Sequence, residues 1–180
     1  MPKFRLLYEI LMKDGVISES SVSRPEIIPA EKIHLAHSPY YITSFVKGTL
    51  ERQEIRRTGL PWSEQLVTRT LTALSGSVLS AEIALKKGIC CNVAGGTHHA
   101  HYDFGSGFCI VNDLAVAPLS LLHDGRVSRV MIIDLDVHQG DGTARILDGH
   151  DRIFTFSLHC KENFPFQKAK SSLDIELPEG

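Results

Sequence analysis

The sequence predicts an α/β fold in which a parallel sheet lies between layers of helices. Short apolar runs alternate along the chain with amphipathic segments, an order that is typical of such a sheet. The run from Val130 to Ile133 is continuously apolar, as expected for a strand that is buried on both faces. Acidic residues, a histidine and glycines follow it at once. Polar groups just beyond a strand mark the edge at which open α/β sheets bind ligands.

The N-terminal third of the chain is predicted to be helical with long connections. Apolar residues at helical spacing indicate a helix over residues 3–13. A second, short helix is expected over 39–46, with Ser38 as its N-terminal cap. His34 and His37 precede it without a carboxylate at useful spacing, so we expect them to be surface or capping residues.

The clearest helix is predicted to follow Ser63 and to end at Lys87-Gly88. Its apolar residues form one continuous stripe, which we expect to face the core. The members of the stripe are Val67, Leu71, Leu74, Val78, Ala81 and Leu85.

The rest of the chain is predicted to alternate strands and helices. We expect strands over 89–93, 130–133, 153–158 and 173–177, a helix over 111–122 and another after Gly142.

Composition describes one globular domain. The 180 residues are 43% hydrophobic and 22% charged, and a chain of this length buries roughly 70% of its unfolded surface. The net charge of −2 argues against a general nucleic-acid binder. No long uncharged apolar segment indicates a secretory signal or membrane anchor, and the four cysteines lack disulfide spacing. We therefore expect a protein of the cytoplasm or nucleus.

Two polar clusters stand where strands are predicted to end. Asp134, Asp136 and His138 alternate along an extended chain, so their side chains leave on one side. The glycine-rich loop 95–100 follows the preceding predicted strand and carries two adjacent imidazoles. If Asp136 and His138 bind a metal, Asp134 and Asp141 are left as carboxylate partners for those imidazoles. The alternatives are a solvated turn at the strand end and a histidine cluster that is merely exposed.

Three motifs together resemble the zinc-dependent histone deacetylase family, which includes bacterial acetoin-utilisation and acetylpolyamine-hydrolase relatives. They are Gly95-Gly96-Thr97-His98-His99-Ala100, Gly107-Phe108-Cys109-Ile110-Val111-Asn112-Asp113 and the stretch from Asp134 to Gly142. The resemblance covers roughly residues 60–180, is looser before them, and Gln139 places the chain nearer the bacterial and class IV branches. It implies the three-layer α/β/α arginase/deacetylase-like fold, with residues 1–180 as a single, partial deacetylase domain.

The resemblance also implies the metal ions. Asp136 and His138 would be two of the three protein ligands that hold a catalytic Zn²⁺, which polarises the amide carbonyl and lowers the pKa of its water. A monovalent cation, K⁺, would lie against residues that supply chiefly backbone oxygens. These residues are Asp134, Asp136, His138, Ser157 and Leu158.

Catalytic roles follow from the same resemblance. His98 would be held by Asp134. His99, oriented by Asp141, would be the general base that takes a proton from water and returns it to the lysine amine. The implied reaction is hydrolysis of an acetyl-lysine amide, on a histone, on another protein or on an acetylpolyamine.

A narrow substrate tunnel is also implied by the resemblance. Gly107 and Phe108 would line it with Phe164 opposite, so that two aromatic faces grip the aliphatic stem of the acyl-lysine. Without the motif around it, Phe108 would instead be interpreted as a core residue.

The sequence departs from the family in its second half. The family's third zinc ligand, an aspartate, and its carbonyl-polarising tyrosine have no match, so we expect a chain that is incomplete at the C-terminus. The residues considered and rejected for these roles are Asp148, Asp151, Asp174, Tyr8, Tyr40, Tyr41 and Tyr102.

The sequence is compatible with three functions. The first is a zinc-dependent deacetylase. The second is a non-catalytic fragment that binds metal or a protein partner, or that forms a homo-oligomer, and the missing ligand and tyrosine favour it for the 180-residue chain. The third is an arginase-like ureohydrolase with two manganese ions, which ranks last because Asp141 follows His138 one residue too late for its motif.

Overall fold

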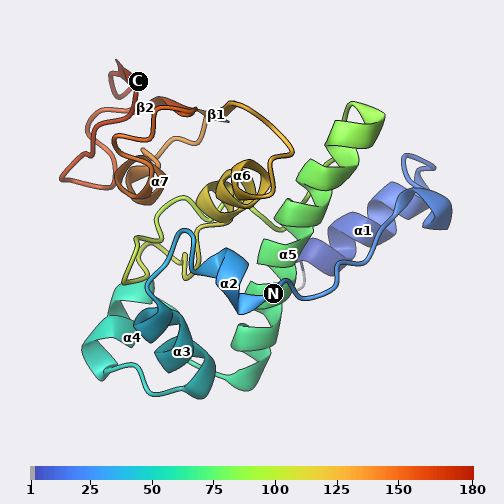
Figure 1. Ribbon diagram of the computed structural model, residues 1–180, viewed down its shortest axis with the longest axis horizontal. Helices are drawn as coiled ribbons and strands as arrows, with labels where there is room; N and C mark the ends of the chain where they lie inside the picture. Colours follow the sequence, from blue (N-terminus) through green and yellow to red (C-terminus); the bar gives the residue numbers. More distant parts are fainter. Residues whose placement is uncertain (1–2) are drawn as a thin grey trace.

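The structure is a computed structural model that describes residues 3–180. Figure 1 shows the elements, and the three strands form one parallel sheet in the order β1-β2-β3. The predicted α/β class with a parallel sheet is therefore confirmed. In chain order the elements are α1 (Lys3–Lys13), the 3-10 helix η1 (Glu19–Ser21), α2 (Ala30–Ile33), α3 (Pro39–Lys47), α4 (Arg52–Thr58), α5 (Glu64–Lys87), α6 (Asp113–His123), β1 (Val130–Asp134), α7 (Asp141–Ile146), β2 (Ile153–Cys160) and β3 (Leu173–Leu177).

Two helices begin at the caps that the sequence predicts. The Ser38 hydroxyl accepts from the Tyr41 amide at 3.5 Å at the start of α3. The Ser63 hydroxyl accepts from the Leu66 amide at 3.1 Å at the start of α5. Each bond satisfies one of the amides that a helix N-terminus leaves free. Helix α4, by contrast, is not predicted from the sequence pattern.

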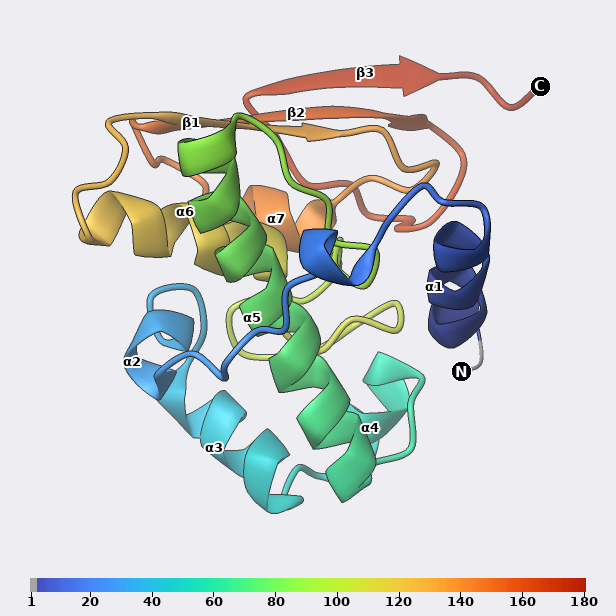
Figure 2. The same cartoon turned by 90° about the vertical axis from the view of Figure 1, so that its right-hand side faces the viewer.

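One face of the sheet is covered by helices. Figure 2 shows α6 and α7 beneath the three strands, with α5 crossing beside α6. The core lies between these layers, and Leu74 and Val78 of α5 are buried in it. The predicted stripe of α5 leaves the core toward its C-terminal end, where Leu85 is exposed. No helix in the described part of the chain is long and apolar enough to cross a membrane.

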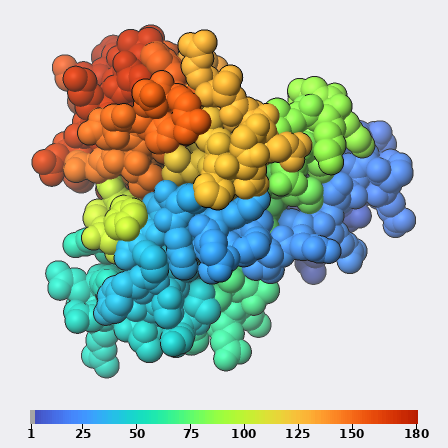
Figure 3. Space-filling view, in the orientation of Figure 1, coloured from blue at the N-terminus to red at the C-terminus, as the bar shows by residue number. Residues whose placement is uncertain are grey.

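The opposite face of the sheet is bare and apolar. Met131 and Ile133 of β1 are each 59% exposed, so the prediction that this strand is buried on both faces is wrong for residues 3–180. Their neighbours across the strands are apolar as well, because Ile133 pairs with Phe156 and Phe156 pairs with Leu173. The space-filling view shows the strands and their loops (orange to red) gathered in one part of the molecule (Figure 3).

Two local predictions are also wrong. Residues 89–93 form no strand, and Ile89 and Val93 are 78% and 53% exposed. A strand needs a neighbour that takes up its backbone hydrogen bonds, and β1 pairs only with β2 among the described residues. His37 is not a surface residue but is completely buried, where its Nε2 accepts from the Asn112 amide at 2.8 Å.

Candidate active site

The predicted site residues come from three segments that meet at the carboxyl end of β1. Asp134 is the last residue of that strand, and the chain after it runs directly into α7. The loop before α6 brings the adjacent rings of His98 and His99 to this edge, with their centroids 4.1 Å apart. Residues that lie more than thirty positions apart in the sequence therefore form one cluster.

His98 is paired with Asp134. Its Nδ1 lies 2.7 Å from Asp134 Oδ2, and both side chains are largely buried. Burial lowers the pKa of His98, but the bond to Asp134 and the nearby carboxylates outweigh it, so the pKa lies above its usual value. Gly140 makes this approach possible, because a side chain there would collide with the Asp134 carboxylate.

His99 is paired with Asp141, the first residue of α7. Its Nδ1 lies 2.8 Å from Asp141 Oδ1, and both residues are buried. The second oxygen of the same carboxylate lies 3.1 Å from His101 Nε2. Burial raises the pKa of Asp141, yet the hydrogen bonds from His101 and His99 outweigh it and hold the pKa well below its usual range. The carboxylate is therefore ionised and accepts from both rings.

Asp136 and His138 lie beside these histidines and are half-exposed. Asp136 Oδ1 is 2.8 Å from His138 Nδ1 and 4.0 Å from His98 Nε2. Burial raises the pKa of Asp136, but its hydrogen bonds with His138 outweigh this effect and lower it. An aspartate and a histidine are donors that Zn²⁺ accepts, so the pair fits two of the three protein positions of a catalytic zinc site. No group of three possible ligands converges in this way among residues 3–180.

Asn112 holds the histidine loop against α7. Its side-chain amide donates to the Ala100 carbonyl and to the Thr143 hydroxyl, both at 3.0 Å, while its oxygen caps α6 by accepting from Ala115. Asn112 is completely buried. The sequence motif includes this residue, but no pattern in it reveals that one side chain joins the loop to two helices.

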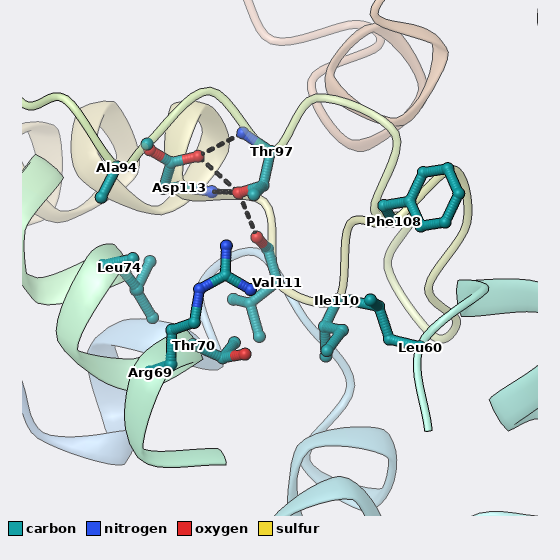
Figure 4. Close-up of a pocket in the computed structure, with 12 residues that line it drawn as sticks. Leu60, Arg69, Thr70, Leu74, Ala94, Thr97, Phe108, Ile110, Val111 and Asp113 are labelled. Atoms are coloured by element: carbon teal, nitrogen blue, oxygen red, sulfur yellow. Dashed lines mark hydrogen bonds between the residues drawn. The ribbon is translucent and has the colours of Figure 1, made fainter. Parts of the chain in front are cut away.

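Asp113 holds the same loop from the other side. Its carboxylate accepts from the amides of Gly96 and Thr97 and from the hydroxyls of Thr97 and Ser77. Figure 4 shows the bonds to Thr97 above a hollow into which Arg69 of α5 extends. Asp113 thus fixes the turn that presents the two catalytic candidates, a role that sequence analysis did not assign.

The three predicted tunnel residues have different surroundings. Phe164 stands edge-on to the His99 ring, with centroids 4.8 Å apart, and 6.2 Å from the His138 ring. Gly107, at φ 53°, lies so close to His99 that a side chain would meet its ring. Phe108 is 68% exposed, lies over Gly59, and points away from Thr97 in Figure 4. The tunnel between Phe108 and Phe164 stays a prediction.

The residues predicted to hold a monovalent cation lie along β1 and β2. Ser157 is the register partner of Asp134, and its hydroxyl is buried 2.9 Å from His159 Nδ1. Leu158 follows it toward the carboxyl end of β2. This position is consistent with the predicted backbone oxygens, and the cation itself stays a prediction.

Two residues that were rejected for catalytic roles have structural ones. The buried Tyr41 hydroxyl donates to the Ile110 carbonyl at 3.0 Å, and burial raises the pKa of this phenol. The carboxylate of Asp174 accepts from Gln139 and from the Ser171 amide, both at 2.8 Å.

Comparison with known proteins places this geometry in context. The family profile described as histone deacetylase domain matches residues 1–176. A protein of Picosynechococcus sp. that is described as uncharacterized is 52% identical over 180 residues, which are all of this chain and 60% of that protein. Histone deacetylase 2 of Arabidopsis thaliana is 28% identical, over 97% of this chain and 47% of its own length.

A solved structure has the same fold. The crystal structure of an HDAC homolog from Aquifex aeolicus superposes with a TM-score of 0.78 at 25% identity. The match covers 94% of this chain and 51% of that one. The chain thus spans about half the length of the relatives it matches.

Proposed function

Because the chain belongs to the histone deacetylase family, we propose that its histidine–aspartate cluster hydrolyses the amide bond of an acetylated lysine once the fold is complete. One observation carries the proposal. His98 and His99 are adjacent, each bonds a different aspartate at 2.7–2.8 Å, and both lie beside the Asp136–His138 pair. A general base held by a carboxylate next to a candidate metal pair is the arrangement that amide hydrolysis needs.

The roles of the residues follow from their partners. Because ionised Asp141 accepts the Nδ1–H of His99, the Nε2 of His99 keeps its lone pair and can take a proton from the attacking water. The same nitrogen returns the proton to the lysine nitrogen as the C–N bond breaks, which yields acetate and the free amine. His98, held by Asp134 at 2.7 Å, stabilises negative charge that develops at the carbonyl oxygen.

Asp136 and His138 would hold a zinc ion, which supplies Lewis acidity toward the carbonyl when bound. Phe164 forms an apolar wall against His99 and excludes water from one side of the base. Gly107 lets the main chain pack directly against the same ring, because a side chain there would meet it. Family membership supports an acetylated amine as the substrate, on a protein such as a histone or on a polyamine.

A second function has support in the same structure. The 180-residue chain has two candidate metal ligands, Asp136 and His138, and a bare apolar sheet face. Both features suit a fragment that binds metal or a protein partner without turnover. The binding function is proposed for the 180-residue chain by itself. The hydrolase function is proposed for a protein of full family length.

The test uses a family-length version, defined as the Picosynechococcus relative with its matching 180 residues replaced by residues 1–180. We expect it to release acetate from an acetyl-lysine peptide, and comparison with an acetylated polyamine identifies the preferred class. His99→Ala should lower turnover by on the order of 10² or more with zinc retained, and His98→Ala should lower it less. The proposal is refuted if the folded, zinc-loaded parent hydrolyses neither substrate.

A further inference from the structure

Asp141 is shared between two imidazoles. Its Oδ1 is 2.8 Å from His99 Nδ1, and its Oδ2 is 3.1 Å from His101 Nε2. All three side chains are more than nine-tenths buried. An ionised carboxylate only accepts hydrogen bonds, so each ring must present an N–H to it. His101 therefore carries its proton on Nε2 and His99 carries one on Nδ1.

The second aspartate of the cluster is fixed differently. Asp134 Oδ2 holds His98, and its other oxygen, Oδ1, accepts from the main-chain amide of Asp136 at 3.0 Å. The orientation of that carboxylate is thus set by the backbone. For Asp141, the contact that occupies the other oxygen comes from the His101 side chain. Because the terminal torsion of aspartate is broad, a carboxylate held at one oxygen can rotate.

His101 is itself held firmly. Its ring stacks on Phe104 at 4.2 Å between centroids and 21° between planes. Its main-chain amide donates to the Phe104 carbonyl at 2.9 Å, which closes the turn 101–104. The guanidinium of Arg57 in α4 also lies over Phe104, 4.5 Å from the ring centroid. Phe104 therefore contacts both Arg57 and His101.

We propose that His101 is a positioning residue, which occupies the second oxygen of Asp141 and thereby fixes this carboxylate where it keeps His99 as the Nδ1–H tautomer. The tautomer matters because it leaves the lone pair on His99 Nε2, the ring nitrogen that does not bond Asp141. The effect of this tautomer on catalysis rests on the proposed function. The positioning itself is a property of the 180-residue chain and can be measured without turnover.

Two substitutions separate the donor from the ring. His101→Phe keeps an aromatic ring for the stack on Phe104 and removes the N–H. His101→Gln removes the ring and keeps an amide donor near the Nε2 position. His123→Phe, at the exposed end of α6, is the matched control because it changes a histidine that is remote from Asp141.

The readout is the tautomer of each histidine, measured by long-range ¹H–¹⁵N correlation in ¹⁵N-labelled protein at one slightly alkaline pH. We expect His99 as Nδ1–H and His101 as Nε2–H in the parent and in His123→Phe. In His101→Phe the His99 signals should move to averaged positions, and in His101→Gln they should stay near the parent. An unchanged His99 in a folded His101→Phe, or a lost Nδ1–H in a folded His101→Gln, overturns the proposal.

Turnover gives a second readout in the family-length version. His101→Phe should lower kcat about tenfold with KM little changed, in the range seen when a partner of a site residue is lost, and His101→Gln should restore most of it. Equal loss in both variants would indicate a merely structural role. If the parent is inactive the proposed function fails, while the tautomer measurement still decides the role of His101.

Discussion

Gln139 and Ala169 are joined by a reciprocal pair of hydrogen bonds. The side-chain amide of Gln139 donates to the Ala169 carbonyl at 3.0 Å, and the main-chain amide of Ala169 donates back to Gln139 Oε1 at 2.7 Å. Gln139 follows the metal-site candidate His138 directly and is completely buried. The pair therefore anchors the loop 161–172, which carries Phe164, to the end of β1.

Removing this anchor should loosen that loop. We expect Gln139→Ala to lower the free energy of unfolding by about 1–3 kcal/mol, because it leaves two partly buried main-chain groups of Ala169 unpaired. Urea unfolding measures the loss, and limited proteolysis should show faster cleavage within 161–172. Gln167→Ala, an exposed glutamine of the same loop, is the control. Equal stability of the two variants would contradict the anchoring role.

The metal assignment can be checked by metal content. In the family-length version we expect one zinc per chain, and its loss from Asp136→Ala and from His138→Ala, because each removes a ligand from a site with three protein ligands. Metal analysis after dialysis measures this. Asp151→Ala, an exposed aspartate before β2, should keep its zinc. Stoichiometric zinc in both ligand variants would show that the ligands lie elsewhere.

The 180-residue chain should have no measurable deacetylase turnover. Asp136 and His138 by themselves give zinc two ligands where three are usual, which weakens its binding. A donor to the developing oxyanion is also unmatched in this chain, and removal of one such donor typically costs about 10² to 10³ in rate. Assay of residues 1–180 with added zinc is the measurement. Turnover close to that of the family-length version would mean that these roles belong to residues assigned otherwise.

The bare sheet face should make residues 1–180 prone to self-association. We expect Ile133→Lys to reduce binding of a hydrophobic dye and to raise solubility with little loss of stability, because this side chain is exposed. Ile132→Lys should destabilise the chain strongly, because Ile132 packs against the core on the opposite, helix-covered face and an unpaired charge there is costly. In the family-length version Ile133→Lys should also be destabilising. Dye fluorescence and thermal unfolding test all three.

His37 should make stability depend on pH. Burial lowers the pKa of His37 from 6.5 to about 4, so the unfolded chain binds this proton more readily than the folded one. The free energy of unfolding should therefore fall as the pH drops from about 6.5 toward 4, by about 3 kcal/mol from this residue. His37→Gln, which keeps an acceptor for the Asn112 amide, should flatten this dependence in urea titrations. An equally steep dependence in the variant would assign it to other groups.

The local features of the fold could be read from the sequence because they depend on neighbouring residues. The caps Ser38 and Ser63 and the long helix α5 follow from short-range spacing. The strand predicted over 89–93 failed because a strand depends on a distant neighbour, and an apolar run does not reveal whether one is present. The prediction that His37 is a surface or capping residue was wrong for a similar reason. Its ring is buried against Asn112, which lies 75 positions later in the sequence.

For the site, the sequence by itself determined which residue types stand at the strand end, and the motif resemblance suggested the pairs His98–Asp134 and His99–Asp141. Only the tertiary structure decided that one aspartate serves two imidazoles, that Asn112 and Asp113 clamp the histidine loop, and that Phe108 lies over Gly59. The physical reason is that hydrogen-bond partners are chosen by distance and direction in space. A motif fixes the order of groups along the chain, whereas packing of α6 and α7 beneath the sheet fixes which of them meet.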